Sequence, residues 1–80
     1  MTTFDELQDI FREVFDDPEL ALRPEMTAQD IYGWDSLSNM TLMMAIELKF
    51  GLKILPQDQM QFHNVGDMAQ HIARKKDAMP

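Results

Sequence analysis

The residues with the clearest chemical potential lie in one short run, from Gly33 to Leu37. Here a serine hydroxyl, Ser36, follows the carboxylate of Asp35, after a loop and at the expected start of a helix. Asp and Ser are the ordinary capping residues of helix starts. A helix start also favours a phosphate group, because its free N–H groups and its dipole attract anions. The run therefore indicates either a simple helix cap or a serine that carries a phosphodiester.

Other kinds of chemistry find little support in the sequence. The chain has no cysteine, which excludes disulfides, thiolate metal sites and thiol nucleophiles. His63 and His71 are the two histidines, and their spacing matches no usual pair of metal ligands. Nothing in the sequence places either histidine beside a serine as a general base, and no glycine-rich phosphate-binding motif is present. We therefore expect neither a metal site nor an enzyme.

A first helix is predicted over residues 3–16, on the N-terminal side of the run. Its apolar residues recur at steps of three and four, as on one face of an amphipathic helix: Phe4, Leu7, Phe11, Val14 and Phe15. Thr3 and Glu6 have the spacing of a capping box. Pro18 disfavours helical geometry at the preceding residue, so the helix is expected to stop there.

The second predicted helix starts at Asp35 or Ser36 and ends at Phe50, with Asp35 as N-cap and Gly51 as C-cap. Its apolar positions form one series that a second series widens: Leu37, Met40, Met44 and Leu48, then Leu42, Met43, Ile46 and Phe50. The methionines are either ordinary core filling or an adaptable lining for a variable ligand, because Met fills irregular space.

The remaining segments complete a small all-α bundle of three main helices, one or two short helices and a long first loop. The loop spans residues 17–34 and should be held to the core by Leu20, Leu22, Met26 and Ile31. Residues 52–56 are short and extended, without a partner strand. An irregular turn over 57–63 should bury Met60 and Phe62, and the last helix should begin at Asn64, leaving 77–80 frayed.

Length and charge limit the possible functions. Eighty residues allow one domain, 1–80, with a thin core. A net charge of −7 argues against nucleic acid and against an anionic membrane as partners. No apolar run is long enough for a membrane span, and the acidic N-terminal stretch is no secretory signal, so a cytoplasmic location is expected. The charge is uneven: residues 1–48 hold eleven acids and two bases, and residues 49–80 hold three acids and five bases.

With these elements in place, the sequence resembles the acyl carrier proteins over nearly its whole length. The resemblance rests on three features: the Asp35-Ser36-Leu37 motif, the helix that follows it through Phe50 and Gly51, and the start of the last helix at Val65. It implies that Ser36 carries 4'-phosphopantetheine, moved from coenzyme A by a phosphopantetheinyl transferase that itself uses magnesium. It also implies a monomer that holds acyl groups as thioesters and presents them to acyl-loading and acyl-processing enzymes.

The resemblance also implies roles for other residues. Asp35 would orient the site or contact the transferase, and Leu37 would neighbour the attachment point. Further along the helix, Met40, Thr41 and Met44 would flank the arm or its acyl group. Three residues would contact partner enzymes: Trp34, Glu47 and Leu48. An alternative for Trp34 is packing of the loop against the first helix.

The sequence departs from the family pattern in its second helix and after it. Positions that are often acidic in the family are here Ser38, Thr41, Leu48 and Lys49, so the helix has no net charge. We therefore expect a carrier for a specialised pathway, such as polyketide or nonribosomal-type assembly, or lipid or glycan modification. The alternatives are the primary carrier of fatty-acid synthesis, or a small helical adaptor in which Ser36 is only an N-cap. Leu55, inserted before Pro56, predicts local distortion of a short helix over 56–61.

Overall fold

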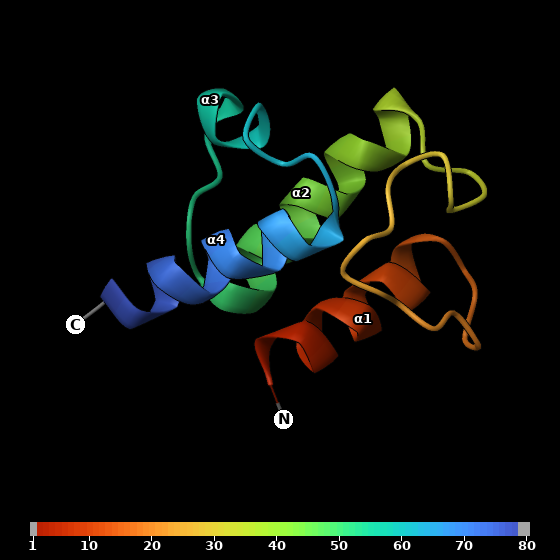
Figure 1. The fold of residues 1–80 in the computed structure, drawn as a ribbon, viewed down its shortest axis with the longest axis horizontal. Coiled ribbons are helices and arrows are strands. Elements are labelled where there is room, and N and C mark those ends of the chain that lie inside the picture. Colours follow the sequence, from red (N-terminus) through yellow and green to blue (C-terminus); the bar gives the residue numbers. More distant parts are fainter. Residues whose placement is uncertain (1, 79–80) are drawn as a thin grey trace.

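The computed structural model describes residues 2–78, and within them the chain forms four helices and no strand. The helices are α1 (Thr3–Val14), α2 (Ser36–Phe50), α3 (Pro56–Gln59) and α4 (Val65–Ala78). α1 contacts both α2 and α4, and the long first loop runs along one end of the bundle (Figure 1). The predicted architecture of three main helices, a short helix and a long first loop is confirmed.

α1 begins at Thr3, as predicted, but its capping box lies one residue earlier than expected. The N-cap is Thr2, whose Oγ1 accepts a hydrogen bond from the Asp5 N–H at 3.1 Å, while the Thr2 N–H donates to the Asp5 carboxylate at 3.3 Å. The predicted box of Thr3 and Glu6 is therefore wrong. Both of those side chains instead contact Lys76 of α4: its ammonium donates to Thr3 Oγ1 at 3.3 Å and lies 3.5 Å from the Glu6 carboxylate.

α1 also ends earlier than residue 16. Asp16 has a φ of 52°, a left-handed conformation that Asp tolerates better than most residues do. This conformation turns the chain back, so that the Asp17 N–H donates to the Arg12 carbonyl at 3.0 Å. The helix is closed by this turn and ends at Val14, before Pro18 has any effect.

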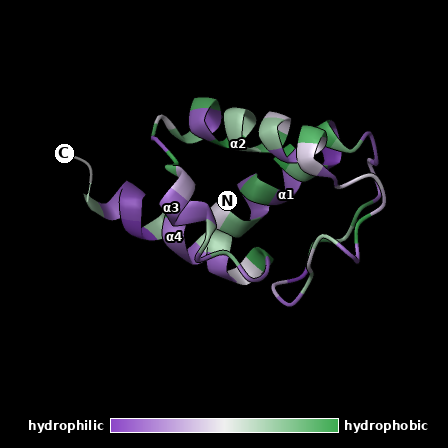
Figure 2. Ribbon diagram, turned by 90° about the horizontal axis from the view of Figure 1, so that it is seen from above, coloured by the Kyte–Doolittle hydropathy of each residue, from purple (hydrophilic) through white to green (hydrophobic). Residues whose placement is uncertain are grey.

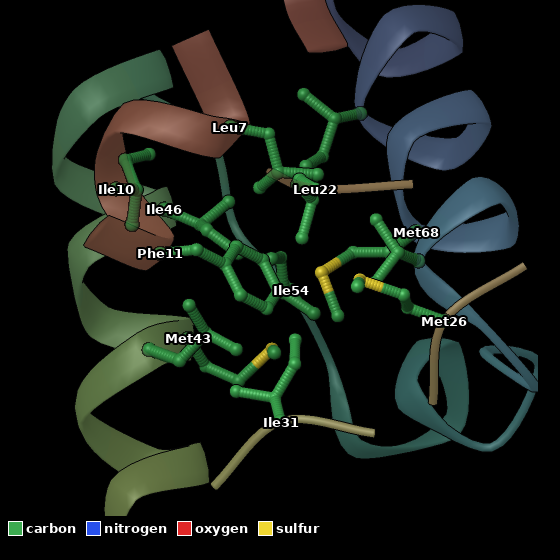
Figure 3. Close-up of a cluster of buried hydrophobic side chains, with 13 residues drawn as sticks. Leu7, Ile10, Phe11, Leu22, Met26, Ile31, Met43, Ile46, Ile54 and Met68 are labelled. Carbon is green, nitrogen blue, oxygen red and sulfur yellow. The ribbon is translucent and has the colours of Figure 1, made fainter. Parts of the chain in front are cut away.

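The first loop belongs to the core, as predicted. Leu22, Met26 and Ile31 are buried and point into the same cluster as the helical side chains (Figure 3). Leu20 is partly buried against that cluster. The Leu22 N–H donates to the Gln8 side chain of α1 at 2.8 Å, which fixes the middle of the loop to α1.

The same loop is joined to the start of α4. The Val65 N–H donates to the Met26 carbonyl at 2.9 Å, and the Gly66 N–H donates to the Pro24 carbonyl at 2.7 Å. A Cβ atom at Gly66 would lie 3.1 Å from that Pro24 oxygen, a distance at which backbone would have to shift. The first N–H groups of a helix have no partner within the helix, and here the loop supplies one for two of them.

α2 has the predicted bounds, from its Asp35 N-cap to Gly51, whose φ of 66° ends the helix in left-handed geometry. Its apolar residues do not form one buried stripe, however. Leu42, Met43 and Ile46 are buried, whereas the other series is exposed (Leu37, Met40, Met44 and Leu48). The prediction that these methionines fill the core is therefore confirmed for Met43 and wrong for Met40 and Met44. In Figure 2, α2 lies along one edge of the molecule and carries hydrophobic residues along its length.

The segment after α2 differs in detail from the prediction. Residues 52–55 are extended but form no strand, and α3 is a single turn that starts at Pro56 and stops at Gln59. Phe62 packs against the core, but Met60 is 77% exposed, so its predicted burial is wrong.

α4 starts as predicted, because the Asn64 side chain accepts a hydrogen bond from the Asp67 N–H at 2.8 Å. α4 continues through Ala78, so residues 77 and 78 are helical rather than frayed. The last two residues of the predicted tail, 79 and 80, lie outside the described residues.

The two apolar series of α2 predict opposite mutational effects. Leu42→Ala should lower the free energy of unfolding by about 2–5 kcal/mol, because it leaves a cavity among fully buried side chains. Leu48→Ala, on the same helix but 84% exposed, should change it by no more than about 0.5 kcal/mol. Urea unfolding followed by circular dichroism measures both. Equal losses would contradict the assignment of the buried face.

Candidate functional site

Ser36 is the first residue of α2 and its side chain is exposed. Neither its hydroxyl nor its backbone N–H makes a hydrogen bond within residues 2–78. The hydroxyl is thus accessible to an external enzyme that could use it as a nucleophile. It lies beside the positive end of the α2 dipole. A phosphodiester on this oxygen fits the site, because the unpaired Ser36 N–H and the dipole both favour the negative charge.

The carboxylate of Asp35 is engaged with Ser38 rather than with Ser36. It accepts a hydrogen bond from the Ser38 N–H at 2.9 Å, and the Asp35 N–H donates to Ser38 Oγ at 2.8 Å. Hydrogen bonds from the Ser38 backbone and side chain hold the pKa of the exposed Asp35 carboxyl below its usual range. Asp35 therefore caps α2 as an anion and leaves the serine hydroxyl free.

Trp34 packs the end of the loop against α1. Its ring meets Phe11 edge-on at a centroid distance of 5.3 Å and lies 5.9 Å from Phe15. Gly33, with a φ of 89°, makes the turn that precedes it. Trp34 was expected either to contact partners or to pack the loop against the first helix. These contacts support the packing role.

A hydrogen-bonded chain runs from Trp34 across the top of α2 to α3. The Trp34 indole N–H donates to Asn39 Oδ1 at 3.0 Å, and the Asn39 amide donates to Gln59 Oε1 at 3.3 Å. All three side chains are part-buried. Asn39 and Gln59 were not predicted from the sequence, although a lone amide three residues after Ser36 in an apolar helix is a signal that could have identified Asn39.

An open cleft of about 670 Å³ lies beside Ser36, between the loop, α2, α3 and the start of α4. Trp34, Asp35 and Ser36 line it together with Asn39 and Gln59. Its other lining residues are Thr27, Ala28, Gln29, Met43, Phe62, His63, Asn64 and Met68. Anything tethered to Ser36 therefore has this cleft directly within reach.

The other residues predicted for the site lie elsewhere on α2. Leu37, Met40, Thr41 and Met44 are exposed and do not line the cleft, and Leu48 is exposed one turn beyond Met44. Together the four apolar residues Leu37, Met40, Met44 and Leu48 form what we call the outer stripe of α2.

Glu47 has an internal contact. Its carboxylate accepts a hydrogen bond from the Ile54 N–H at 2.8 Å, which ties the end of α2 to the segment before α3. Glu47 was expected to contact partner enzymes, but in the structure its side chain is engaged within the chain.

α3, which forms one wall of the cleft, is fastened to α4 through Asp58. The Asp58 carboxylate accepts a hydrogen bond from the Leu55 N–H at 2.9 Å and lies 3.6 Å from the Lys75 ammonium and 3.7 Å from His71 Nε2. The Leu55 hydrogen bond, then Lys75 and His71, hold the pKa of Asp58 below its usual range, against an opposing contribution from burial.

This lowered pKa predicts a pH dependence of stability. A carboxyl whose pKa is lower in the folded state stabilises the fold above its unfolded pKa of about 3.9, and this contribution is lost as the pH falls through the folded pKa. The native protein should therefore be more stable than Asp58→Asn at pH 6, and the difference should shrink below about pH 4. Urea unfolding of both proteins from pH 3 to pH 7 measures it. A difference that is constant over this range would contradict the prediction.

The chain is similar to known proteins in both sequence and structure. The family described as "Phosphopantetheine attachment site" matches residues 5–72. An acyl carrier protein of Helicobacter pylori strain 26695 is 32% identical over 76 residues, covering 95% of this chain and 97% of the relative, and that of strain J99 is 30% identical. The solution structure of holo acyl carrier protein from Geobacter metallireducens superposes with a TM-score of 0.87 at 39% identity, covering 100% of this chain and 97% of that one.

These matches agree with the exposed serine at the head of α2 and with the all-helical fold. Over residues 2–78, every helix is too short or too polar to cross a lipid bilayer. Proteins of this family bear a phosphopantetheine prosthetic group and work with transferases and acyl-processing enzymes. The chain belongs to the acyl carrier proteins, the phosphopantetheine-bearing carriers of acyl groups.

Proposed function

We propose that Ser36 bears the 4'-phosphopantetheine arm and that the carrier serves a specialised biosynthetic pathway rather than primary fatty-acid synthesis. The observation that carries the attachment is the exposed Ser36 hydroxyl, which has no hydrogen-bond partner in residues 2–78 and lies inside the matched family region. Asp35, held as an anion by Ser38, supports it by leaving that hydroxyl free.

The proposed loading step uses only one atom of this chain. Ser36 Oγ forms the new ester bond to phosphorus, its proton leaves to a base of the transferase, and the phosphoanhydride bond of coenzyme A breaks to release its adenosine bisphosphate part. The attached arm supplies a thiol, on which acyl groups are held as thioesters. The chain has no turnover of its own in this proposal. Its fold presents the arm to partner enzymes.

The specialised role is supported by the exposed face of α2. The outer stripe (Leu37, Met40, Met44 and Leu48) is apolar, and α2 contains only two charged residues, Glu47 and Lys49. Because Glu47 is bound to the Ile54 N–H, Lys49 is the more exposed of the two charges on α2. Partner enzymes that dock on strongly acidic carrier helices would find little electrostatic attraction here.

The negative charge of the chain lies instead on α1 and the first loop. We infer that apolar contacts with the outer stripe contribute most of the docking energy and that the acidic segments mainly steer the approach. A monomer in the cytoplasm is part of the proposal.

Attachment is tested by incubating the apo protein with coenzyme A and a broad-specificity phosphopantetheinyl transferase. The intact mass should rise by one phosphopantetheine group, and Ser36→Ala should abolish the gain. Ser38→Ala is the matched control, because this serine lies on the same turn but its hydroxyl is engaged with Gly33 at 2.8 Å, so the control should still be loaded. No gain in the native protein would favour the adaptor alternative, in which Ser36 is only an N-cap.

The specialised role is tested with a malonyl-loading transacylase of primary fatty-acid synthesis. This carrier should be a poorer substrate, by kcat/KM, than the Helicobacter pylori acyl carrier protein. Leu48→Glu should raise kcat/KM about two- to fivefold at low salt, because it adds an exposed charge to the docking face, and this gain should fall as salt increases.

Leu55→Glu is the control for that variant. It adds the same charge at an exposed position outside α2, so it should leave kcat/KM unchanged. Equal efficiency of this carrier and the Helicobacter pylori protein, with the same slope against salt, would support the primary fatty-acid role instead.

A further inference from the structure

The cleft beside Ser36 has both polar and apolar walls. Eight of its thirteen lining residues are polar, and among them Asp35 is the one acid. The side-chain amides belong to Gln29, Asn39, Gln59 and Asn64. The apolar lining residues are Ala28, Trp34, Met43, Phe62 and Met68. Of these, Met43 and Met68 are buried in the core. A group that enters this cleft therefore meets hydrogen-bonding side chains as well as apolar ones.

The chain Trp34–Asn39–Gln59 links three segments that border this cleft. Asn39 stands in the middle: its oxygen accepts from Trp34 of the loop, and its amide donates to Gln59 of α3. The second bond is the longer one, at 3.3 Å against 3.0 Å, so it is the easier one to exchange. Opening a path between α2 and α3 would separate Asn39 from Gln59.

The cost of that separation depends on what enters. An alkyl chain offers no hydrogen bond, so two part-buried amide groups would lose their partner and gain none, which is unfavourable by about fivefold or more in an equilibrium constant. An acyl group with a hydroxyl or carbonyl close to its thioester replaces the lost partner. The cleft therefore discriminates by chemistry rather than by size alone.

We propose that the Trp34–Asn39–Gln59 chain makes this carrier selective for short acyl groups that bear a hydrogen-bonding substituent, and that it excludes long alkyl chains. Gln59 and Asn39 are the specificity-determining residues. This proposal rests on attachment at Ser36 and adds the class of acyl group that the arm carries.

The test loads the apo protein with a broad-specificity phosphopantetheinyl transferase, using three coenzyme A thioesters as donors: butanoyl, 3-hydroxybutanoyl and octanoyl. Intact mass first verifies each loading. Cleavage of each protein-bound thioester by hydroxylamine is then timed and divided by the rate for the same acyl group on free coenzyme A. The normalised rate for 3-hydroxybutanoyl should be at least about fivefold lower than for butanoyl, and octanoyl should show no extra protection.

Variants separate a selective role of the chain from a merely structural one. Gln59→Leu replaces the amide with an apolar group of similar size, so it should remove the protection of 3-hydroxybutanoyl and create protection of octanoyl. Gln61→Leu is the matched control, because Gln61 is exposed and does not line the cleft, and it should retain the native order of rates.

Trp34 gives a second readout, since it is the one tryptophan of the sequence. Its indole N–H signal in the nitrogen–proton correlation spectrum should shift on loading with 3-hydroxybutanoyl, relative to the holo protein with a free thiol, and not with butanoyl. If the free holo arm causes the same shift, the cleft holds the arm itself and the proposal is wrong.

The outcomes distinguish this proposal from the proposed function. Octanoyl protected as well as 3-hydroxybutanoyl in the native protein would overturn the selectivity while leaving attachment at Ser36 intact. Failure of all three loadings, seen in the mass, would overturn the attachment and this proposal with it.

Discussion

A bundle of this size buries one face of each helix, and for α2 the choice of that face determines the rest of the structure. Apolar residues surround much of α2, but only Leu42, Met43 and Ile46 reach the core. With this face turned inward, Ser36 is exposed at the head of the helix, Asn39 faces α3 across the cleft, and the outer stripe faces solvent. The positions of the proposed attachment point, the cleft wall and the proposed docking face thus all follow from which face of α2 is buried.

The first loop contributes to that packing as much as a helix would. Three of its side chains belong to the core, and its backbone supplies partners for the first N–H groups of α4. Trp34 then ends the loop on the aromatic side chains of α1, directly before the Asp35 cap. The position of Ser36 therefore depends on contacts with α1 and α4 as well as on α2 itself. This is a physical reason for a long connection without regular structure in so small a domain.

Features that depend on neighbouring residues could be predicted from the sequence. The caps at Asp35, Gly51 and Asn64 are short-range, and all three are confirmed. The N-cap of α1 was misplaced because Thr2 and Thr3 compete as caps, and Lys76, seventy-three residues from Thr3, engages the second of them. The buried face of α2 and the exposure of Met60 depend on packing between distant segments, so periodicity alone could not give them. The cleft could not be predicted from the sequence for the same reason, because it exists only where the loop, α2 and α3 meet.

The methionines, finally, differ in their chemical vulnerability. Met26, Met43 and Met68 are enclosed in the core, whereas Met40, Met44 and Met60 are largely exposed. Oxidation to the sulfoxide turns an apolar side chain into a polar one and follows accessibility. A mild oxidant would thus reach the thioethers of the outer stripe while the folded core stays reduced. It would make the proposed docking face of α2 polar in an intact carrier, and reductases for methionine sulfoxide would reverse the change.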